Sequence, residues 1–132
     1  MVVIMNTLIE IGFYKVGEWR LNDGKLALDL SLEVTSANCL YAFACGQQVF
    51  YIGKTTQTVQ KRLNGYLRPG LTQSTNIRNH HNIVKLLQYI DSLDIYCLED
   101  NGFLKYGQFQ INLAAGLEDA LIKAINPLWN CR

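Results

Sequence analysis

Residues 39–53 read CLYAFACGQQVFYIG, and this stretch decides the fold of the chain. Two apolar runs, Leu40–Ala44 and Val49–Ile52, flank a polar turn, which is typical of a β-hairpin. Each run is associated with one tyrosine, and a tyrosine in an apolar run is usually a packed strand residue. The pattern therefore predicts two neighbouring strands that carry Tyr41 and Tyr51.

The hydrophobic period changes after Gly53, which is expected to end the second strand. Val59, Leu63 and Tyr66 recur at helical spacing, and Thr58 is a suitable N-cap for this helix. The later elements follow from turn residues and apolar periodicity. They are a loop over residues 67–75, a helix over 76–90, a strand over 94–98, a polar connection over 100–107 and a helix over 112–125 that ends before Pro127.

The N-terminal part alternates aromatic and polar residues between Gly12 and Leu30, around the sequence Asn22-Asp23-Gly24. Because Asp-Gly supplies the positive φ angles of a tight turn, a β-hairpin is predicted here. Together these patterns predict an α/β fold. It consists of a small three-stranded antiparallel sheet flanked by helices, with an added N-terminal β-hairpin.

The size and charge of the chain restrict its function. Its 132 residues are enough for one compact domain, and the net charge of +1 provides no global basic field for binding long stretches of duplex. The basic residues instead gather between positions 54 and 78, where no Asp or Glu occurs. They are Lys54, Lys61, Arg62, Arg68 and Arg78. Such a run is either a solvated helix face or a surface that faces phosphates, and charge alone does not separate the two.

The four cysteines, Cys39, Cys45, Cys97 and Cys131, have neither the spacing of a zinc site nor that of a disulfide framework. They are expected to be buried thiols in a reducing cytosol. The first eleven residues include Glu10, lack a basic region and are too short to span a bilayer. A cytoplasmic protein without a membrane partner is therefore expected.

Two common motifs are excluded. Gly53-Lys54-Thr55 follows a strand, but a phosphate-binding loop would need glycine at position 48, which is Gln48. His80 and His81 are adjacent, so on a helix their rings point about 100° apart and cannot easily share a metal. They are expected to be polar residues near a helix start.

An ordered set of residues remains: Cys39-Leu40-Tyr41, Tyr51-Ile52-Gly53-Lys54-Thr55, Arg62, Tyr66, Gly116-Leu117-Glu118, Leu121-Ile122-Lys123 and Pro127-Leu128-Trp129-Asn130. In order and spacing this set resembles the GIY-YIG nuclease superfamily, over residues 38–130. Two positions depart from the family pattern. Cys39-Leu40 replaces the usual Gly-Ile, and Tyr66 stands where many members carry His. The tyrosine of the first tripeptide is present.

The resemblance implies a nuclease domain over residues 38–132 and an accessory β-hairpin region over residues 1–37. It also implies a divalent cation, Mg²⁺ or Mn²⁺, one per active site, with Glu118 as the single carboxylate ligand. A lone carboxylate suits Mg²⁺, which keeps several waters when bound. A solvated helix glutamate is the alternative interpretation of this residue.

The other roles also follow from the resemblance. Tyr41 would be the general base, and because an unperturbed phenol has a pKa near 10, a cation such as Lys54 or Arg62 is expected to lower that pKa. Arg62 would clamp the phosphate through its planar fork. Further residues would position water and substrate or, alternatively, serve in packing or on the surface. These are Tyr51 and Tyr66 by their hydroxyls, Asn130 as a brace, and Lys54, Arg68 and Arg78 as substrate-binding cations.

The expected function is metal-dependent endonucleolytic cleavage of DNA, in restriction-like defence, a mobile element or repair. One catalytic centre cuts one strand, so a homodimer is expected if the protein makes double-strand breaks. A catalytically silent nucleic-acid-binding module of the same fold is the main alternative. A protein-interaction or apolar-ligand domain, suggested only by Phe13, Tyr14 and Trp19, would leave the later motif unexplained.

Overall fold

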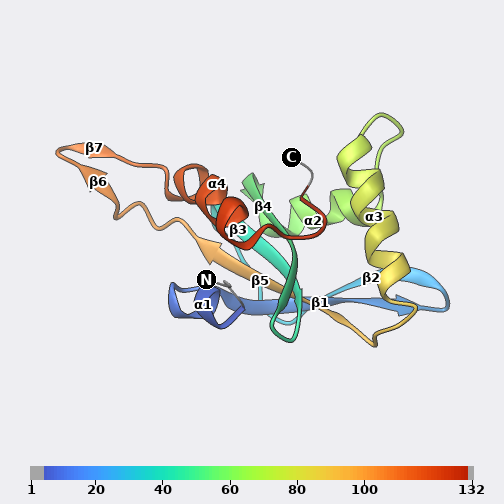
Figure 1. The fold of residues 1–132 in the computed structure, drawn as a ribbon. Helices are drawn as coiled ribbons and strands as arrows, with labels where there is room; N and C mark the ends of the chain where they lie inside the picture. Colours follow the sequence, from blue (N-terminus) through green and yellow to red (C-terminus); the bar gives the residue numbers. More distant parts are fainter. Residues whose placement is uncertain (1–4, 131–132) are drawn as a thin grey trace.

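A five-stranded antiparallel sheet forms the centre of the protein, and helices cover it (Figure 1). The computed structural model describes residues 5–130. The strands follow the order β2-β1-β5-β3-β4 across the sheet. The helices are α1 (Met5–Glu10), α2 (Val59–Leu67), α3 (Ser74–Leu86) and α4 (Leu113–Ile125); the strands are β1 (Tyr14–Asn22), β2 (Lys25–Leu30), β3 (Ala37–Cys45), β4 (Gln48–Thr58), β5 (Leu93–Glu99), β6 (Lys105–Tyr106) and β7 (Phe109–Gln110).

The sheet is larger than the three strands predicted, because the N-terminal hairpin joins it. This hairpin is confirmed as β1 and β2, with Asp23 and Gly24 at φ 52° and 77° in its turn. Strand β1 also pairs with β5 on its other side. Trp19 of β1 is fully buried, and its ring packs edge-on against Phe43 at 5.8 Å between centroids. The aromatic residues of the N-terminal part therefore extend the common core.

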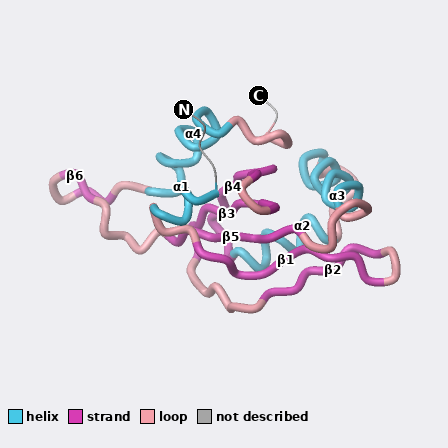
Figure 2. The backbone as a smooth tube through the Cα atoms, turned by 60° about the horizontal axis from the view of Figure 1, so that its bottom comes forward, coloured by secondary structure: helices cyan, strands magenta, loops and turns pink. Residues whose placement is uncertain are grey.

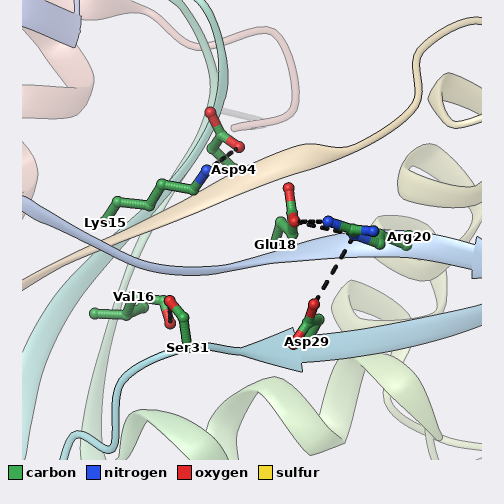
Figure 3. Close-up of polar contacts among 7 residues, drawn as sticks. All are labelled: Lys15, Val16, Glu18, Arg20, Asp29, Ser31 and Asp94. Carbon is green, nitrogen blue, oxygen red and sulfur yellow. Dashed lines mark hydrogen bonds and ion pairs between the residues drawn. The ribbon is translucent and has the colours of Figure 1, made fainter.

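Polar contacts also help to hold β1 and β2 in the sheet (Figure 3). Lys15 of β1 forms an ion pair with Asp94 of β5, with 3.1 Å between Nζ and Oδ1. Arg20 contacts Glu18 on its own strand and lies 3.9 Å from Asp29 on β2. Because these side chains are partly or largely exposed to solvent, the ion pairs contribute little, and the buried aromatic contacts dominate.

Strand β4 does not end at Gly53, as the sequence suggested, but continues to Thr58. Gly53 lies opposite Tyr41 on β3. A Cβ atom at position 53 would stand 2.5 Å from both Cζ and the hydroxyl oxygen of Tyr41, which is closer than real contacts allow. This glycine therefore makes room for the tyrosine ring within a continuous strand.

The two faces of the sheet carry different helices. One face, with Tyr41, Phe43 and Tyr51, packs against α2 and α3. The other, with Leu40 and Ile52, packs against α1 and α4. Figure 2 shows α2 and α3 beside one another and away from α1 and α4. The alternation of side chains along β3 thus separates two layers of the core.

The predicted helices are confirmed with small changes at their ends. Thr58 caps α2, accepting a hydrogen bond from the backbone of Lys61 at 3.3 Å. Helix α3 begins at Ser74 and ends at Leu86. Helix α4 is followed by Asn126 in the left-handed conformation. Among residues 5–130, no helix is long and apolar enough to cross a lipid bilayer.

The connection predicted over residues 100–107 contains part of a projecting ribbon, β6–β7 (Figure 1). Apolar side chains on and beside it are exposed, among them Phe103, Tyr106 and Phe109, at 83%, 81% and 69%. The predicted description of residues 100–107 as a polar connection is therefore incomplete, because large apolar side chains are exposed on and beside it.

Candidate active site

Helix α2 carries Arg62 and Tyr66 one turn apart, which brings their side chains together. The Nη2 group of Arg62 donates a hydrogen bond to the Tyr66 hydroxyl at 2.8 Å. The guanidinium carbon also lies 4.3 Å from the centroid of the Tyr66 ring. Arg62 is thus held against the aromatic ring by a hydrogen bond and a cation–π contact.

Three tyrosines converge beside this arginine. The hydroxyls of Tyr41 and Tyr66 are hydrogen-bonded at 2.5 Å. The Tyr51 ring lies 6.3 Å from that of Tyr41 and 6.2 Å from that of Tyr66, between centroids. Tyr41 and Tyr66 are fully buried and Tyr51 nearly so. A continuous chain of hydrogen bonds therefore runs from Arg62 through Tyr66 to Tyr41.

The expectation that a cation lowers the pKa of Tyr41 is wrong in this structure. Burial raises that pKa well above its ordinary value, and the nearby Tyr51 raises it further, while Arg62 opposes the shift only in part. Burial and Tyr41 likewise raise the pKa of Tyr66. Desolvation outweighs the attraction of the guanidinium because both phenols are enclosed. Tyr41 is therefore a neutral phenol at neutral pH.

Asn76 is a site residue that the sequence analysis missed. Its Oδ1 accepts a hydrogen bond from Nη1 of Arg62 at 2.8 Å, and its Nδ2 donates to Oε1 of Gln73 at 3.1 Å. The same Gln73 oxygen accepts from the backbone of Gly70 at 2.9 Å. Asn76 is buried and lies seven residues before Ile83, on the apolar side of α3. A polar residue on that side was the available signal.

The two adjacent histidines are not brought together as metal ligands. His80 makes a 2.7 Å hydrogen bond through Nδ1 to the backbone carbonyl of Tyr66, which ties α3 to the end of α2. Within residues 5–130 there is no group of three or more His, Cys, Asp or Glu side chains that could hold a metal ion. His80 therefore supports the position of the helix that carries Arg62.

The predicted basic cluster divides into separate surfaces. Lys54, Lys61 and Arg62 line one groove of about 500 Å³, together with polar residues and no carboxylate. Arg68 lines a different cavity, and Arg78 lines a third. A groove with three cations and no acidic wall favours an anionic ligand such as a phosphate.

Glu118 lies on α4, which packs against the face of the sheet opposite Tyr41. It falls on the same side of the helix as Ala114 and Ile122, both buried in that layer. Its side chain is partly buried, and it makes no hydrogen bond or ion pair with another described residue. Within residues 5–130 the carboxylate therefore has no hydrogen-bond or ion-pair partner, and no direct polar contact links it to the tyrosine–arginine cluster.

Asn130 fastens the C-terminal segment to the outer edge of β4. Its Oδ1 accepts from the backbone N–H of Ile52 at 2.9 Å, and its Nδ2 donates to the Ile52 carbonyl at 2.8 Å. The backbone N–H of Trp129 also donates to the Phe50 carbonyl at 2.9 Å. These bonds hold the segment beside Tyr51.

Comparisons with known proteins agree with this architecture. No protein-family model and no curated protein sequence matches the chain. A mutant of bacteriophage T4 EndoII is similar in structure, with a TM-score of 0.73, 24% sequence identity, and coverage of 98% of this chain and 99% of that one. The restriction endonuclease Hpy188I in complex with product DNA is also similar, with a TM-score of 0.56, 17% identity, and coverage of 92% and 80%.

The protein therefore has the fold of these endonucleases. This agrees with the nuclease-like fold that the motifs predicted.

Proposed function

We propose that the protein is a divalent-metal-dependent endonuclease that hydrolyses phosphodiester bonds of DNA. The observation that carries this proposal is the hydrogen-bonded chain Arg62–Tyr66–Tyr41, which begins at a groove lined by cations and no carboxylate. The similarity in fold to a restriction endonuclease bound to product DNA supports it.

Arg62 is the proposed phosphate clamp. A guanidinium has five N–H donors, and the bonds to Asn76 and Tyr66 use one on each terminal nitrogen. The remaining donors are available to phosphate oxygens, and the two protein bonds fix the plane of the fork before substrate binds. Lys54 and Lys61, in the same groove, would attract the neighbouring backbone phosphates.

Tyr41 is the proposed proton-transfer group, with Tyr51 and Tyr66 as its neighbours. Since burial keeps Tyr41 protonated at neutral pH, it does not begin as a phenolate base. Its oxygen would instead take a proton from the attacking water while its own proton passes to Tyr66, and the proton that Tyr66 releases would pass to the oxygen that leaves the phosphate. Tyr51, with a small exposed fraction, would orient the water or phosphate by its hydroxyl.

Glu118 would hold Mg²⁺ or Mn²⁺. Its carboxylate is single and partly exposed and has no partner among the described residues, so most coordination positions would be left to water and phosphate oxygens. A bound cation would supply charge neutralisation at the phosphate and a water of lowered pKa.

Each chain carries one such set of residues, so it would cut one strand at a time. Cleavage of both strands would require a homodimer or two sequential nicks, and a cytoplasmic role in restriction-like defence, a mobile element or repair would suit this activity.

The absence of a direct polar link between Glu118 and Tyr41 within residues 5–130 favours one competing function, a silent DNA-binding module.

Nicking of supercoiled plasmid separates these two functions. The parent should nick in Mg²⁺ and not in excess EDTA, and Glu118→Gln should lose nicking while keeping much of its DNA binding. Glu10→Gln, a change of an exposed glutamate on α1, serves as the matched control. A Glu118→Gln protein that nicks at the parental rate would overturn the metal-ligand role, and equal rates with and without EDTA would overturn metal dependence.

A further inference from the structure

A second groove, of about 510 Å³, lies between α3 and the C-terminal segment. Phe50 and Trp129 line it, with ring centroids 5.0 Å apart and each ring largely buried. Tyr89 and Leu128 also line it but are 83% and 72% exposed. Large exposed apolar side chains beside an aromatic cavity indicate a binding surface.

The groove also carries positive charge. Arg78 and Lys85 are exposed cations in its lining, and no carboxylate is present there. Asn82 lies between them on the same side of α3, at spacings of four and three residues. Its carboxamide makes no hydrogen bond with another described residue, so its donors and acceptor are available to a ligand.

We propose that this groove binds an unpaired nucleobase of a DNA strand, with Arg78 and Lys85 on the adjoining phosphates. The proposal rests on the proposed function in taking DNA as the ligand. A base is planar and apolar on its faces but polar at its edge, so Tyr89 and the Trp129 region would stack on it and Asn82 would bond its edge. The volume lies within the roughly 300–1,000 Å³ range of small-ligand sites.

Charge argues against the exposed apolar ribbon of a second copy as the occupant. The segment of a second copy that could fill such a groove is its exposed apolar ribbon, residues 103–111. It contains Lys105 and no acidic residue, so it would bring a third cation to Arg78 and Lys85. A nucleotide brings a phosphate to the same cations, which favours the nucleic acid.

Trp129 provides a direct test. The chain has two tryptophans, and Trp19 is fully buried in the core, so quenching by a ligand in the groove reports on Trp129. The full protein, in EDTA to prevent cleavage, is titrated with a thymidine strand of about ten nucleotides, a length typical of single-strand sites. A strand of equal length without bases serves as the phosphate-only probe. Dye-labelled strands give the occupancy of each by anisotropy.

The thymidine strand should quench the tryptophan signal, and the strand without bases should not do so at equal occupancy. Tyr89→Ala should weaken binding of the thymidine strand on the order of 10-fold, as expected for loss of one stacking side chain. Tyr106→Ala is the matched control, because Tyr106 is 81% exposed on the β6–β7 ribbon, and it should bind as the parent does.

Equal quenching by both strands, or equal affinities of the Tyr89→Ala and Tyr106→Ala proteins, would overturn base binding in the groove. A signal that follows protein concentration alone would assign the groove to a second copy and would also overturn it. Nicking activity in Mg²⁺ is measured separately. A protein that nicks but does not stack a base refutes this inference alone, whereas one that stacks a base but never nicks refutes the nuclease assignment alone.

Discussion

The Arg62 guanidinium lies against the Tyr66 ring, 4.3 Å from its centroid, and donates a hydrogen bond to the hydroxyl of the same residue at 2.8 Å. One helical turn separates the two residues, so the geometry of α2 sets both contacts. Since Nη1 is simultaneously bound to Asn76, the plane of the guanidinium is fixed from two sides.

Arg62→Lys keeps the positive charge but loses the planar guanidinium fork. A lysine ammonium therefore cannot bond Asn76 and Tyr66 in the same geometry while it also contacts a phosphate. We expect the nicking rate to fall on the order of 10² or more, the scale of a lost transition-state contact. Single-turnover nicking measures this loss. Lys61→Arg, a change of the neighbouring cation in the same groove, is the control. A near-parental rate for Arg62→Lys would show that electrostatic attraction alone is sufficient there.

Asn76→Ala removes the partner that holds Nη1 of Arg62. Asn76 is a positioning residue, so we expect nicking to fall by about 10-fold through the misplaced arginine. Loss of a buried hydrogen bond to a charged group should also cost roughly 1.5–3 kcal/mol of stability.

Two readouts on the same preparation separate these effects. Thermal unfolding gives the stability, and the nicking rate per folded molecule gives the positioning effect. Asn64→Ala, at an exposed position of α2, should change neither strongly. A destabilised Asn76→Ala protein with a normal rate per folded molecule would limit Asn76 to a structural role.

The raised pKa values of the buried tyrosines predict alkaline destabilisation. Tyr41 and Tyr66 bind their protons more tightly in the folded protein than in the unfolded chain, where the pKa is about 10. Their contribution is therefore fully present below about pH 10. Above that pH, unfolding releases protons, and stability should fall by up to about 1.4 kcal/mol per pH unit for each such tyrosine.

Unfolding measured between about pH 9 and pH 11 tests this dependence. Tyr41→Phe and Tyr66→Phe should each flatten the decline, and Tyr89→Phe, at an exposed position, should leave it unchanged. Tyr14, whose pKa is raised by burial and by its bond to Glu99, adds to the decline and remains in all three variants. An identical decline in the Tyr41→Phe and Tyr89→Phe proteins would contradict the burial effect at Tyr41.

Local patterns predicted much of the fold because they depend on neighbouring residues. The Asp23-Gly24 turn and the Thr58 cap are examples, since turn conformation and capping need only a few adjacent positions. The pairing of β1 with β5 was missed because it joins residues about eighty positions apart, such as Tyr14 and Cys97. Nothing in the local pattern specifies such a partner.

The candidate site shows the same limit. The motif placed Tyr41, Arg62 and Tyr66 in one set, but it could not show that the phenols would be buried, which reverses the expected direction of the pKa shift. Gly53 was predicted to end the strand because a glycine weakens a strand. In the structure the glycine is required because the Tyr41 ring packs directly against its backbone. These properties arise from packing between distant residues.

Tyr41→Phe removes one oxygen from a ring that would still pack against Gly53 and Phe43. The lost hydrogen bond to Tyr66 should change stability by no more than about 1–2 kcal/mol. Turnover should nevertheless fall by about 10² to 10⁴, the usual contribution of a positioned acid–base group. Thermal unfolding and single-turnover nicking are measured together on one preparation, with Tyr51→Phe as the comparison. If Tyr41 only packs, the rate per folded molecule will stay near normal, and proton transfer then passes to Tyr51, whose ring lies 6.3 Å away and retains some exposure to the solvent from which a water would attack.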